Sequence, residues 1–479
     1  MRFRPVELTN PAGTSPARKG VLSIVTIGLQ GGTRFASNWL IGLFAGKLAF
    51  AVVANATALA FLLNTVWPSS AQSAASKFIA RARGKGDDAE VHAVARHVGV
   101  RVLQVVAVLS VVAPIVWHLQ YGGPVWEGLC ISAMLIAVAA SQFTRGVHFG
   151  AGQIARGTRI DVITSVVGIT TTGVLLAFGV RNILLTLPLT LAMTVYSLLC
   201  WPWSAHGRPE RELRAEIDKY VTFAALGSIA SAGMLQVSQL TAGAISAEAG
   251  GEYAPALQLV TPLSMVAGAL TLVLFPSMAE AQGAGSTDRL RRTTDLATRG
   301  FLAALVPVFG AMAIASRPII DLVWVGRYPE SAQLMPAFCV ALLLQNVASP
   351  AVSSVTSGPH RNMWFSMSLS WAGFAAAIGC WALWVPRYGI VGVALGYAIG
   401  AAVTSLSLMV VAWRLNGQRW TALMVWLLGA VVLISAISWW RQSQPSDHAL
   451  DLAIAAGFAL LAAAPSLPML RTLLRSRSG

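Results

Sequence analysis

Charged residues are scarce in this sequence, and acidic residues are the scarcest among them. Only 11% of the 479 residues are charged, and 19 Asp and Glu stand against 34 Lys and Arg. A soluble domain usually has about 25% charged residues. Strict alternation of polar and apolar residues, which marks a membrane β-barrel, is also missing. We therefore expect a membrane protein whose spanning segments are helices, because helices satisfy the backbone in lipid.

Motifs that carry catalytic or metal chemistry are also lacking. The four cysteines, Cys130, Cys200, Cys339 and Cys380, lie in or beside apolar stretches without paired spacing, so we expect small buried hydrophobes. The seven histidines form no H-x-x-x-H cluster, and no G-x-x-x-x-G-K-[ST] phosphate loop occurs. The long connections are basic and contain no acidic cluster. We expect no metal, no cofactor and no enzymatic activity.

Apolar sequence, by contrast, is abundant. Hydrophobic residues make up 56% of the chain, and the mean hydropathy is +0.66. Runs of about twenty apolar residues, enough to cross the hydrocarbon core as a helix, recur between short polar connections. The first run is too long for a signal peptide, so we expect it to be retained. We predict fourteen spans, at residues 20–43, 48–69, 98–119, 126–148, 160–180, 182–203, 219–246, 253–276, 299–325, 332–355, 363–385, 389–413, 420–440 and 448–470.

The net charge of +15 follows the predicted topology. With a cytoplasmic N-terminus, most basic residues fall on the cytoplasmic side, for example in KFIARARGKG (77–86) and RPERELR (208–214). This asymmetry is the positive-inside pattern, and anionic lipid accounts for it. No basic stretch is interleaved with stacking aromatics, so we expect no nucleic-acid binding. The basic residues on the outer side are Lys47, Arg181, Arg317, Arg327, Arg387 and Arg441.

A short pattern recurs in the two halves of the chain. VWPSSAQSAASKF (66–78) ends the second predicted span, and LFPSMAEAQGAGS (274–286) ends the eighth, with Pro68 and Pro276 at an offset of 208 residues. The offset indicates two six-helix repeats in the same orientation, an arrangement of transporters. We predict a cytoplasmic segment at 1–19, a six-helix lobe at 20–203, a cytoplasmic linker at 204–218, a second lobe at 219–413, and two additional helices with a basic cytoplasmic tail at 414–479.

Several segments resemble one family. They are the Phe-Pro-Ser pattern with its basic loop, RPIIDLVWVGRYPESAQLMPAF (317–338), GGEYAPALQLV (250–260) and VPRYGIVGVALGYAIG (385–400). On these motifs the chain, over about residues 18–415, resembles the polysaccharide (O-antigen type) flippases of the multidrug/oligosaccharidyl-lipid/polysaccharide exporter superfamily. The first turn between helices, IGLFAGKLAFA (41–51), departs from the family's Gly-Pro or Tyr-Gly pattern. The motifs therefore indicate the superfamily better than a subfamily.

The resemblance implies an all-α polytopic protein with two six-helix lobes around a central cavity. It implies a flippase that moves polyprenyl-diphosphate-linked oligosaccharide from the cytoplasmic to the outer leaflet of the bacterial inner membrane, by alternating access. The implied partners are that lipid-linked cargo, membrane lipids and polysaccharide polymerase machinery. Because an inside-negative potential favours outward movement of a diphosphate by up to about 2.3 kcal/mol per charge per 100 mV, the potential itself is a candidate driving force.

Arg34 is the residue that the apolar pattern does not explain. It lies in LQGGTRFASNWL (29–40), about 21 Å into its span at 1.5 Å per residue, too deep for easy snorkelling. A charge at the centre of a spanning helix costs roughly 2.5–3.5 kcal/mol on insertion scales. No comparably deep Asp or Glu stands out as its partner, and a guanidinium suits phosphate. We expect Arg34 to bind an anionic ligand; the alternative is bonding to helix carbonyls or an amide that fixes packing.

Other polar residues are candidates for the same site. Gln30 and Asn38 flank Arg34 at i−4 and i+4, so the three share one helix face. Gln236 and Gln239 lie at the equivalent depth of the second repeat. Ordinary interhelical hydrogen bonding is an equally good reading of Gln30 and Asn38. For Arg145, binding of the diphosphate at the cytoplasmic mouth competes with a role as a topology determinant, which is favoured.

Two other transport functions stay open on sequence alone. An ion-coupled multidrug exporter of the same superfamily usually needs carboxylates within the membrane, whereas the deep charge here is cationic. A flippase for the peptidoglycan lipid precursor would share lipid and diphosphate with the favoured cargo. The sequence does not indicate the sugar, the coupling ion, the oligomeric state or the role of the last two helices.

Overall fold

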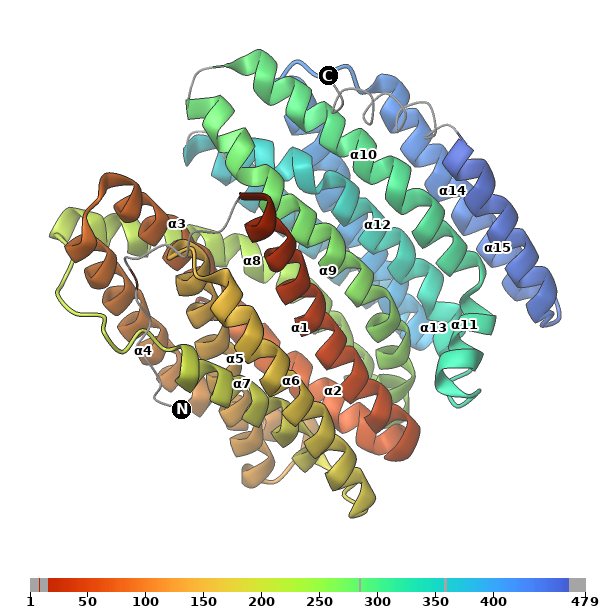
Figure 1. The fold of residues 1–479 in the computed structure, drawn as a ribbon. Helices are drawn as coiled ribbons and strands as arrows, with labels where there is room; N and C mark the ends of the chain where they lie inside the picture. Colours follow the sequence, from red (N-terminus) through yellow and green to blue (C-terminus); the bar gives the residue numbers. More distant parts are fainter. Residues whose placement is uncertain (1–7, 9–15, 284–285, 357–359, 465–479) are drawn as a thin grey trace. The chain divides into compact units, whose positions relative to one another are not determined.

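The computed structural model describes residue 8 and residues 16–283, 286–356 and 360–464, and within them the chain folds into helices joined by short connections. Most of the predicted N-terminal segment and of the basic tail lies outside the described residues. The helices are α1 (Pro16–Phe44), α2 (Lys47–Thr65), α3 (Pro68–Lys85), α4 (Asp88–Tyr121), α5 (Val125–Gly150), α6 (Ile154–Ala177), η1 (Ile183–Thr186), α7 (Leu187–Cys200), α8 (Arg211–Ile245), α9 (Ala247–Gly283), α10 (Thr287–Ile314), α11 (Ser316–Trp324), α12 (Ser331–Thr356), α13 (His360–Leu415), α14 (Thr421–Ser443) and α15 (His448–Ala463) (Figure 1).

The predicted class, an all-α protein with about fourteen spans, is confirmed. Within the described part of the chain, ten helices are long and apolar enough to cross a membrane. The four other predicted spans correspond to α1, to α9, to the second half of α13 and to α15. The 56 residues of α13 contain two predicted spans, which meet at a kink at Gly389 with φ 54° and ψ −130°. Glycine adopts this left-handed conformation without the steric cost that other residues incur.

Two predicted boundaries differ from the structure. The basic segment after the second span is a helix, α3, with Pro68 in its first turn, where proline has no hydrogen bond to lose. The span predicted at 299–325 is two helices, because α10 ends at Ile314 and the backbone turns at Ala315 before α11. Pro276 lies within α9, which continues to Gly283; the side chains of the second Phe-Pro-Ser pattern lie outside the described residues.

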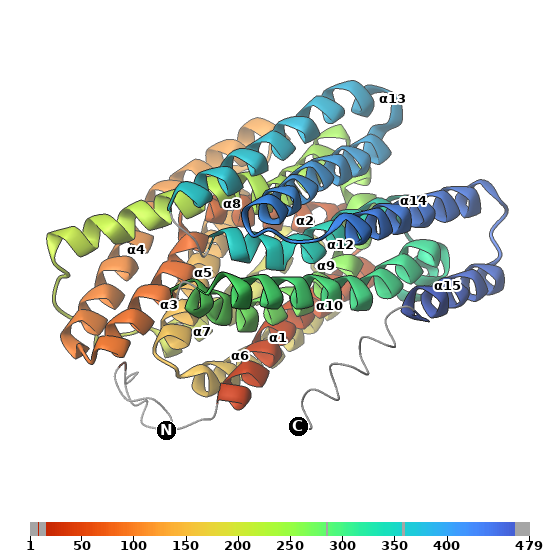
Figure 2. The ribbon, with the colours of Figure 1, turned by 90° about the horizontal axis from the view of Figure 1, so that it is seen from above.

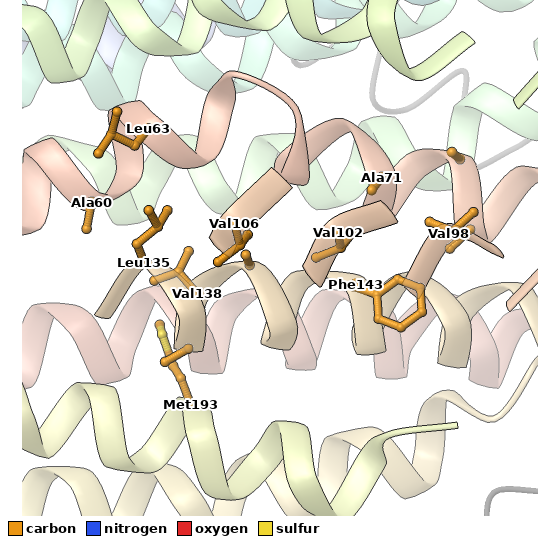
Figure 3. Packing of buried hydrophobic residues seen from close by; sticks show 14 of the residues in the cluster. Ala60, Leu63, Ala71, Val98, Val102, Val106, Leu135, Val138, Phe143 and Met193 are labelled. Atoms are coloured by element: carbon orange, nitrogen blue, oxygen red, sulfur yellow. The ribbon is translucent and has the colours of Figure 1, made fainter. Parts of the chain in front are cut away.

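Residues 1–251 form one compact unit. In it α5 packs against α3, α4 and α7, α1 packs along α6, and α8 packs on α2 and α3 (Figure 1). Its core contains alanine, valine and leucine side chains from α2, α4 and α5, among them Leu63, Val102 and Leu135 (Figure 3). A Cβ at Gly146 would overlap the backbone of Gln72, so α3 and α5 approach each other closely through a glycine.

Residues 252–479 form the second unit. In it α12 packs against α10 and α13, and α15 lies along α10 (Figure 2). The aromatic ring of Phe458 on α15 fills the space beside Gly310 on α10, where a Cβ would overlap it. Arg441 on α14 donates to Asp451 on α15 at 2.6 Å, and both side chains are buried. The last two helices are therefore an integral part of this unit.

The packing units do not coincide with the predicted lobes. The division falls at residues 251 and 252, within α9, and α8 belongs to the first unit. The sequence repeat places α8 with the second lobe instead. The packing units are defined by contacts between helices, whereas the lobes at 20–203 and 219–413 are defined by the sequence repeat. The contacts therefore do not test the lobes, which stay a prediction.

Candidate functional site

Two predicted site arginines of the first unit differ in their ion pairs: Arg145 pairs with a buried carboxylate, and Arg34 pairs with no described residue. Near the end of α5, Arg145 Nη2 donates to Asp161 Oδ1 of α6 at 2.8 Å, and both side chains are 5% exposed. Its Nη1 reaches Ser141 Oγ at 3.3 Å, and its guanidinium carbon lies 4.5 Å from the ring centroid of Tyr196 on α7. Because Asp161 already matches its charge, this geometry does not favour the predicted contact between Arg145 and a diphosphate.

A small cavity lies beside this pair and brings two of the predicted site residues together. Its volume is about 20 Å³, which is room for about one water molecule. Gln30 from α1 and Arg145 from α5 both line it, together with Asp161. The other lining residues are Thr33, Thr164, Ser165, Leu189, Ala192 and Met193. Most polar groups around the cavity are uncharged, and its two charges neutralise each other.

Arg34 is the unpaired arginine. It lies one turn beyond Gln30 on α1, half-buried, with its guanidinium carbon 4.1 Å from the ring centroid of Phe61 on α2. This cation–π contact is worth roughly 0.5–2 kcal/mol. The Arg34 Nε is buried and has no hydrogen-bond partner, and no ion pair within the described residues includes Arg34. A buried donor without an acceptor is unfavourable by about 1–3 kcal/mol or more, so the site suits an anion.

Further polar groups lie on the helices around Arg34. Asn38, one turn beyond it on α1, is buried with 5% of its surface exposed. On α2, Asn64 Nδ2 donates to Gln142 Oε1 of α5 at 2.9 Å, while the buried Asn64 Oδ1 has no partner. Sequence analysis did not identify Gln142. Its only signal is its place three residues before Arg145, on the same face of α5.

The two glutamines of α8 differ in their surroundings. Gln239 is buried, and its Nε2 donates to Asn55 Oδ1 at 2.9 Å and to the carbonyl oxygen of Gly250 at 3.2 Å. These bonds join α2, α8 and the start of α9. At Gly243, a Cβ would overlap the Asn55 side chain, so the helices are in close contact here. Gln239 therefore has a structural role in this geometry, and only the half-buried Gln236 remains as a candidate ligand on α8.

Replacing Gln239 by leucine is expected to lower the free energy of unfolding by about 1–3 kcal/mol, because Asn55 Oδ1 and the Gly250 carbonyl lose their donor in a buried place. Thermal unfolding of the purified protein in detergent measures this. Gln236→Leu is the matched control and should leave the midpoint unchanged. Equal midpoints for both variants would contradict the structural role of Gln239.

The described residues contain no group of three or more His, Cys, Asp or Glu that could hold a metal ion. The four cysteines are free; Cys200 and Cys339 are buried, and Cys130 and Cys380 are half-buried. The burial of Cys200 and Cys339 agrees with the expected small buried hydrophobes, whereas Cys130 and Cys380 are less buried than expected.

Known proteins are similar to this chain in two ways. A family model described as polysaccharide biosynthesis protein matches residues 128–333. Among solved structures, an inward-facing multidrug resistance MATE family transporter of the MOP superfamily has a TM-score of 0.66 at 15% identity, covering 83% of this chain and 98% of its own. A MOP superfamily transporter from Pyrococcus furiosus, described as having a binding pocket of reverse polarity, has a TM-score of 0.65 at 16% identity, covering 86% and 97%. No curated protein sequence matches the chain.

Proposed function

We propose that the chain is a flippase for polyprenyl-diphosphate-linked oligosaccharide. A family model described as polysaccharide biosynthesis protein matches residues 128–333, and the fold is similar to that of multidrug/oligosaccharidyl-lipid/polysaccharide (MOP) transporters. The cargo would move from the cytoplasmic to the outer leaflet of the bacterial inner membrane, with both chain termini in the cytoplasm. The protein would act by alternating access, without a cofactor and without enzymatic activity. Membrane lipids and the polysaccharide polymerase machinery would be its other partners.

The single observation that carries this proposal is Arg34. Its charge lies deep in a predicted span, and no described acidic residue pairs with it. A guanidinium offers a planar fork of donors that matches two phosphate oxygens and stays charged under all ordinary conditions. A diphosphate would supply both the missing counter-charge and the missing acceptor for Nε.

The buried carboxylates support an anionic cargo over a cationic drug. Asp161 pairs with Arg145, and Asp451 pairs with Arg441. Glu252 accepts from the backbone N–H of Ser331. Each buried carboxylate of the described chain thus has a partner within the protein, whereas a cation or a coupling proton needs a carboxylate that is free to bind it.

Deletion of the gene in its host tests the proposal. Complete polyprenyl-diphosphate oligosaccharides should accumulate on the cytoplasmic side, and mass spectrometry quantifies them. Reintroducing the gene at matched expression should clear the pool. The sugar composition of the accumulated lipid separates a surface-polysaccharide unit from the peptidoglycan precursor. An unchanged pool in the deletion strain would overturn the cargo, and export of cationic dyes would then be the measurement for the multidrug alternative.

A further inference from the structure

A hollow lined by four arginines lies at the end of the first unit that the predicted topology places in the cytoplasm. It forms where the start of α4, the connection after α7 and the start of α8 meet, and its volume is about 280 Å³. This is far more than the roughly 10–15 Å³ that one water molecule requires. The lining residues are Arg96, His97, Val100, Arg101, Gln104, Gly207, Arg208, Pro209 and Arg214.

Most of the positive charge in this arginine hollow is not neutralised. Asp218 lies 3.0 Å from His97 (Oδ1 to Nε2) and 3.1 Å from Arg101 (Oδ2 to Nη2). Arg96 donates to the carbonyl oxygen of Gly207 at 3.1 Å, which carries no net charge. Arg208 and Arg214 form no ion pair with a described residue, and Arg214 Nε is buried without a hydrogen-bond partner. Of the four arginines that line the hollow, Arg101 alone forms an ion pair with a described carboxylate, although Arg208 also lines the neighbouring hollow, which contains acidic residues.

A neighbouring hollow of about 610 Å³ shows that this imbalance is local. It also has basic residues, but there Arg81 pairs with Glu216 at 2.8 Å and Lys85 pairs with Glu90 at 2.9 Å. Its other acidic residues are Asp87, Glu210 and Glu212. The positive-inside rule counts Lys and Arg and takes little account of Asp and Glu, so it does not explain why one of two adjacent hollows has five acidic lining residues and the other has none.

An apolar strip leads away from the arginine hollow along α4. Val100 lines the hollow and is 45% exposed, and Leu103 follows one turn further on. Val108, Val111 and Ile115 continue the exposed strip along the predicted span, at spacings that keep them on one helix face. These side chains are exposed and face away from the packed core of the unit. Acyl chains of a bound lipid would lie against them.

We propose that the arginine hollow binds the phosphate headgroup of an anionic phospholipid of the cytoplasmic leaflet, with its acyl chains along the α4 strip. Guanidinium groups suit phosphate because they can donate two parallel hydrogen bonds. The strip favours a lipid over a soluble phosphate, which would gain nothing from apolar surface. This binding site does not depend on the identity of the transported cargo.

Native mass spectrometry of the delipidated full-length protein in detergent tests the proposal. We expect one molecule of phosphatidylglycerol to remain bound at concentrations where phosphatidylcholine does not. Inorganic phosphate at millimolar concentration should not displace it. Displacement by inorganic phosphate, or equal retention of the two lipids, would overturn the lipid site.

Variants locate the bound lipid. Arg96→Gln combined with Arg208→Gln should weaken phosphatidylglycerol binding about tenfold or more, because two charges near the phosphate are lost. Arg81→Gln, which removes an arginine that is also exposed but is paired with Glu216, should leave binding unchanged. If the double variant does not fold, Arg208→Gln alone, on the exposed connection before α8, should weaken binding in the same direction. An equal loss of phosphatidylglycerol binding in Arg81→Gln would contradict the proposal.

Discussion

Arg34→Ala is expected to abolish clearance of the lipid-linked oligosaccharide pool while leaving the fold intact. The unpaired guanidinium is the group that we propose binds the diphosphate. Losing a charge-assisted, two-pronged contact of about 3 kcal/mol corresponds to a factor of roughly 100 in binding. Arg34→Lys keeps the charge but not the fork, so it should keep part of the activity. The activity of the unchanged protein, Arg34→Ala and Arg34→Lys is measured by the size of the lipid-linked oligosaccharide pool in deletion strains that express each of them.

A second arginine separates this effect from loss of general positive charge. Arg159 is exposed near the start of α6, so Arg159→Ala makes the same chemical change outside the proposed site and should preserve activity. The unfolding midpoint of Arg34→Ala should stay close to that of the unchanged protein, because loss of the cation–π contact with Phe61 is offset by removal of the buried, unbonded Nε. Full activity of Arg34→Ala would remove the basis for an anionic site on α1. A large drop in its midpoint would support a packing role instead.

Asp161→Ala is expected to destabilise the protein by about 3–5 kcal/mol, because it leaves the buried Arg145 guanidinium without a counter-charge. Arg145→Ala should do the same by leaving Asp161 unpaired. The double replacement Arg145→Met with Asp161→Leu should recover most of the loss, since two apolar side chains avoid buried charge altogether. Thermal unfolding of the purified variants in detergent gives the coupling between the two positions.

If the double variant Arg145→Ala with Asp161→Ala lost as much stability as the two single alanine variants together, that would contradict an interaction between Arg145 and Asp161. The transport activity of the stable double variant carries separate information. If it still clears the lipid-linked pool, the charge of Arg145 is not needed to attract the cargo, as the ion pair suggests.

The arrangement of the spans was readable from sequence because each span must be apolar over about twenty residues. Hydropathy does not mark a backbone break within an apolar stretch, so the turn at Ala315 between α10 and α11 was missed. The helix α3 was missed for the opposite reason. Its sequence is polar and basic, and its helical character shows only in its alanines and in Pro68 at its start.

In the candidate site, too, the sequence predicted features that follow from one helix alone and missed those that depend on which helices are neighbours. Arg34 was predicted from a local rule, that a deep charge needs a partner, and the structure leaves it unpaired within the described chain. Asp161 as the partner of Arg145 and Gln239 as a structural bond to Asn55 depend on which helices lie side by side. A single sequence does not contain that information, because helix periodicity gives the polar face of a helix but not the helix opposite.

The central claim is that the protein moves a lipid diphosphate through contact with Arg34. The most direct measurement reconstitutes the purified protein in liposomes with a fluorescent polyprenyl-diphosphate sugar and follows its transfer between leaflets, with Arg34→Ala and Arg159→Ala in parallel. The account predicts transfer by the unchanged protein and by Arg159→Ala, faster with a potential that favours the exit of anions, and transfer at the rate of protein-free liposomes for Arg34→Ala. Equal transfer by Arg34→Ala and the unchanged protein, at equal amounts of folded protein, would contradict it.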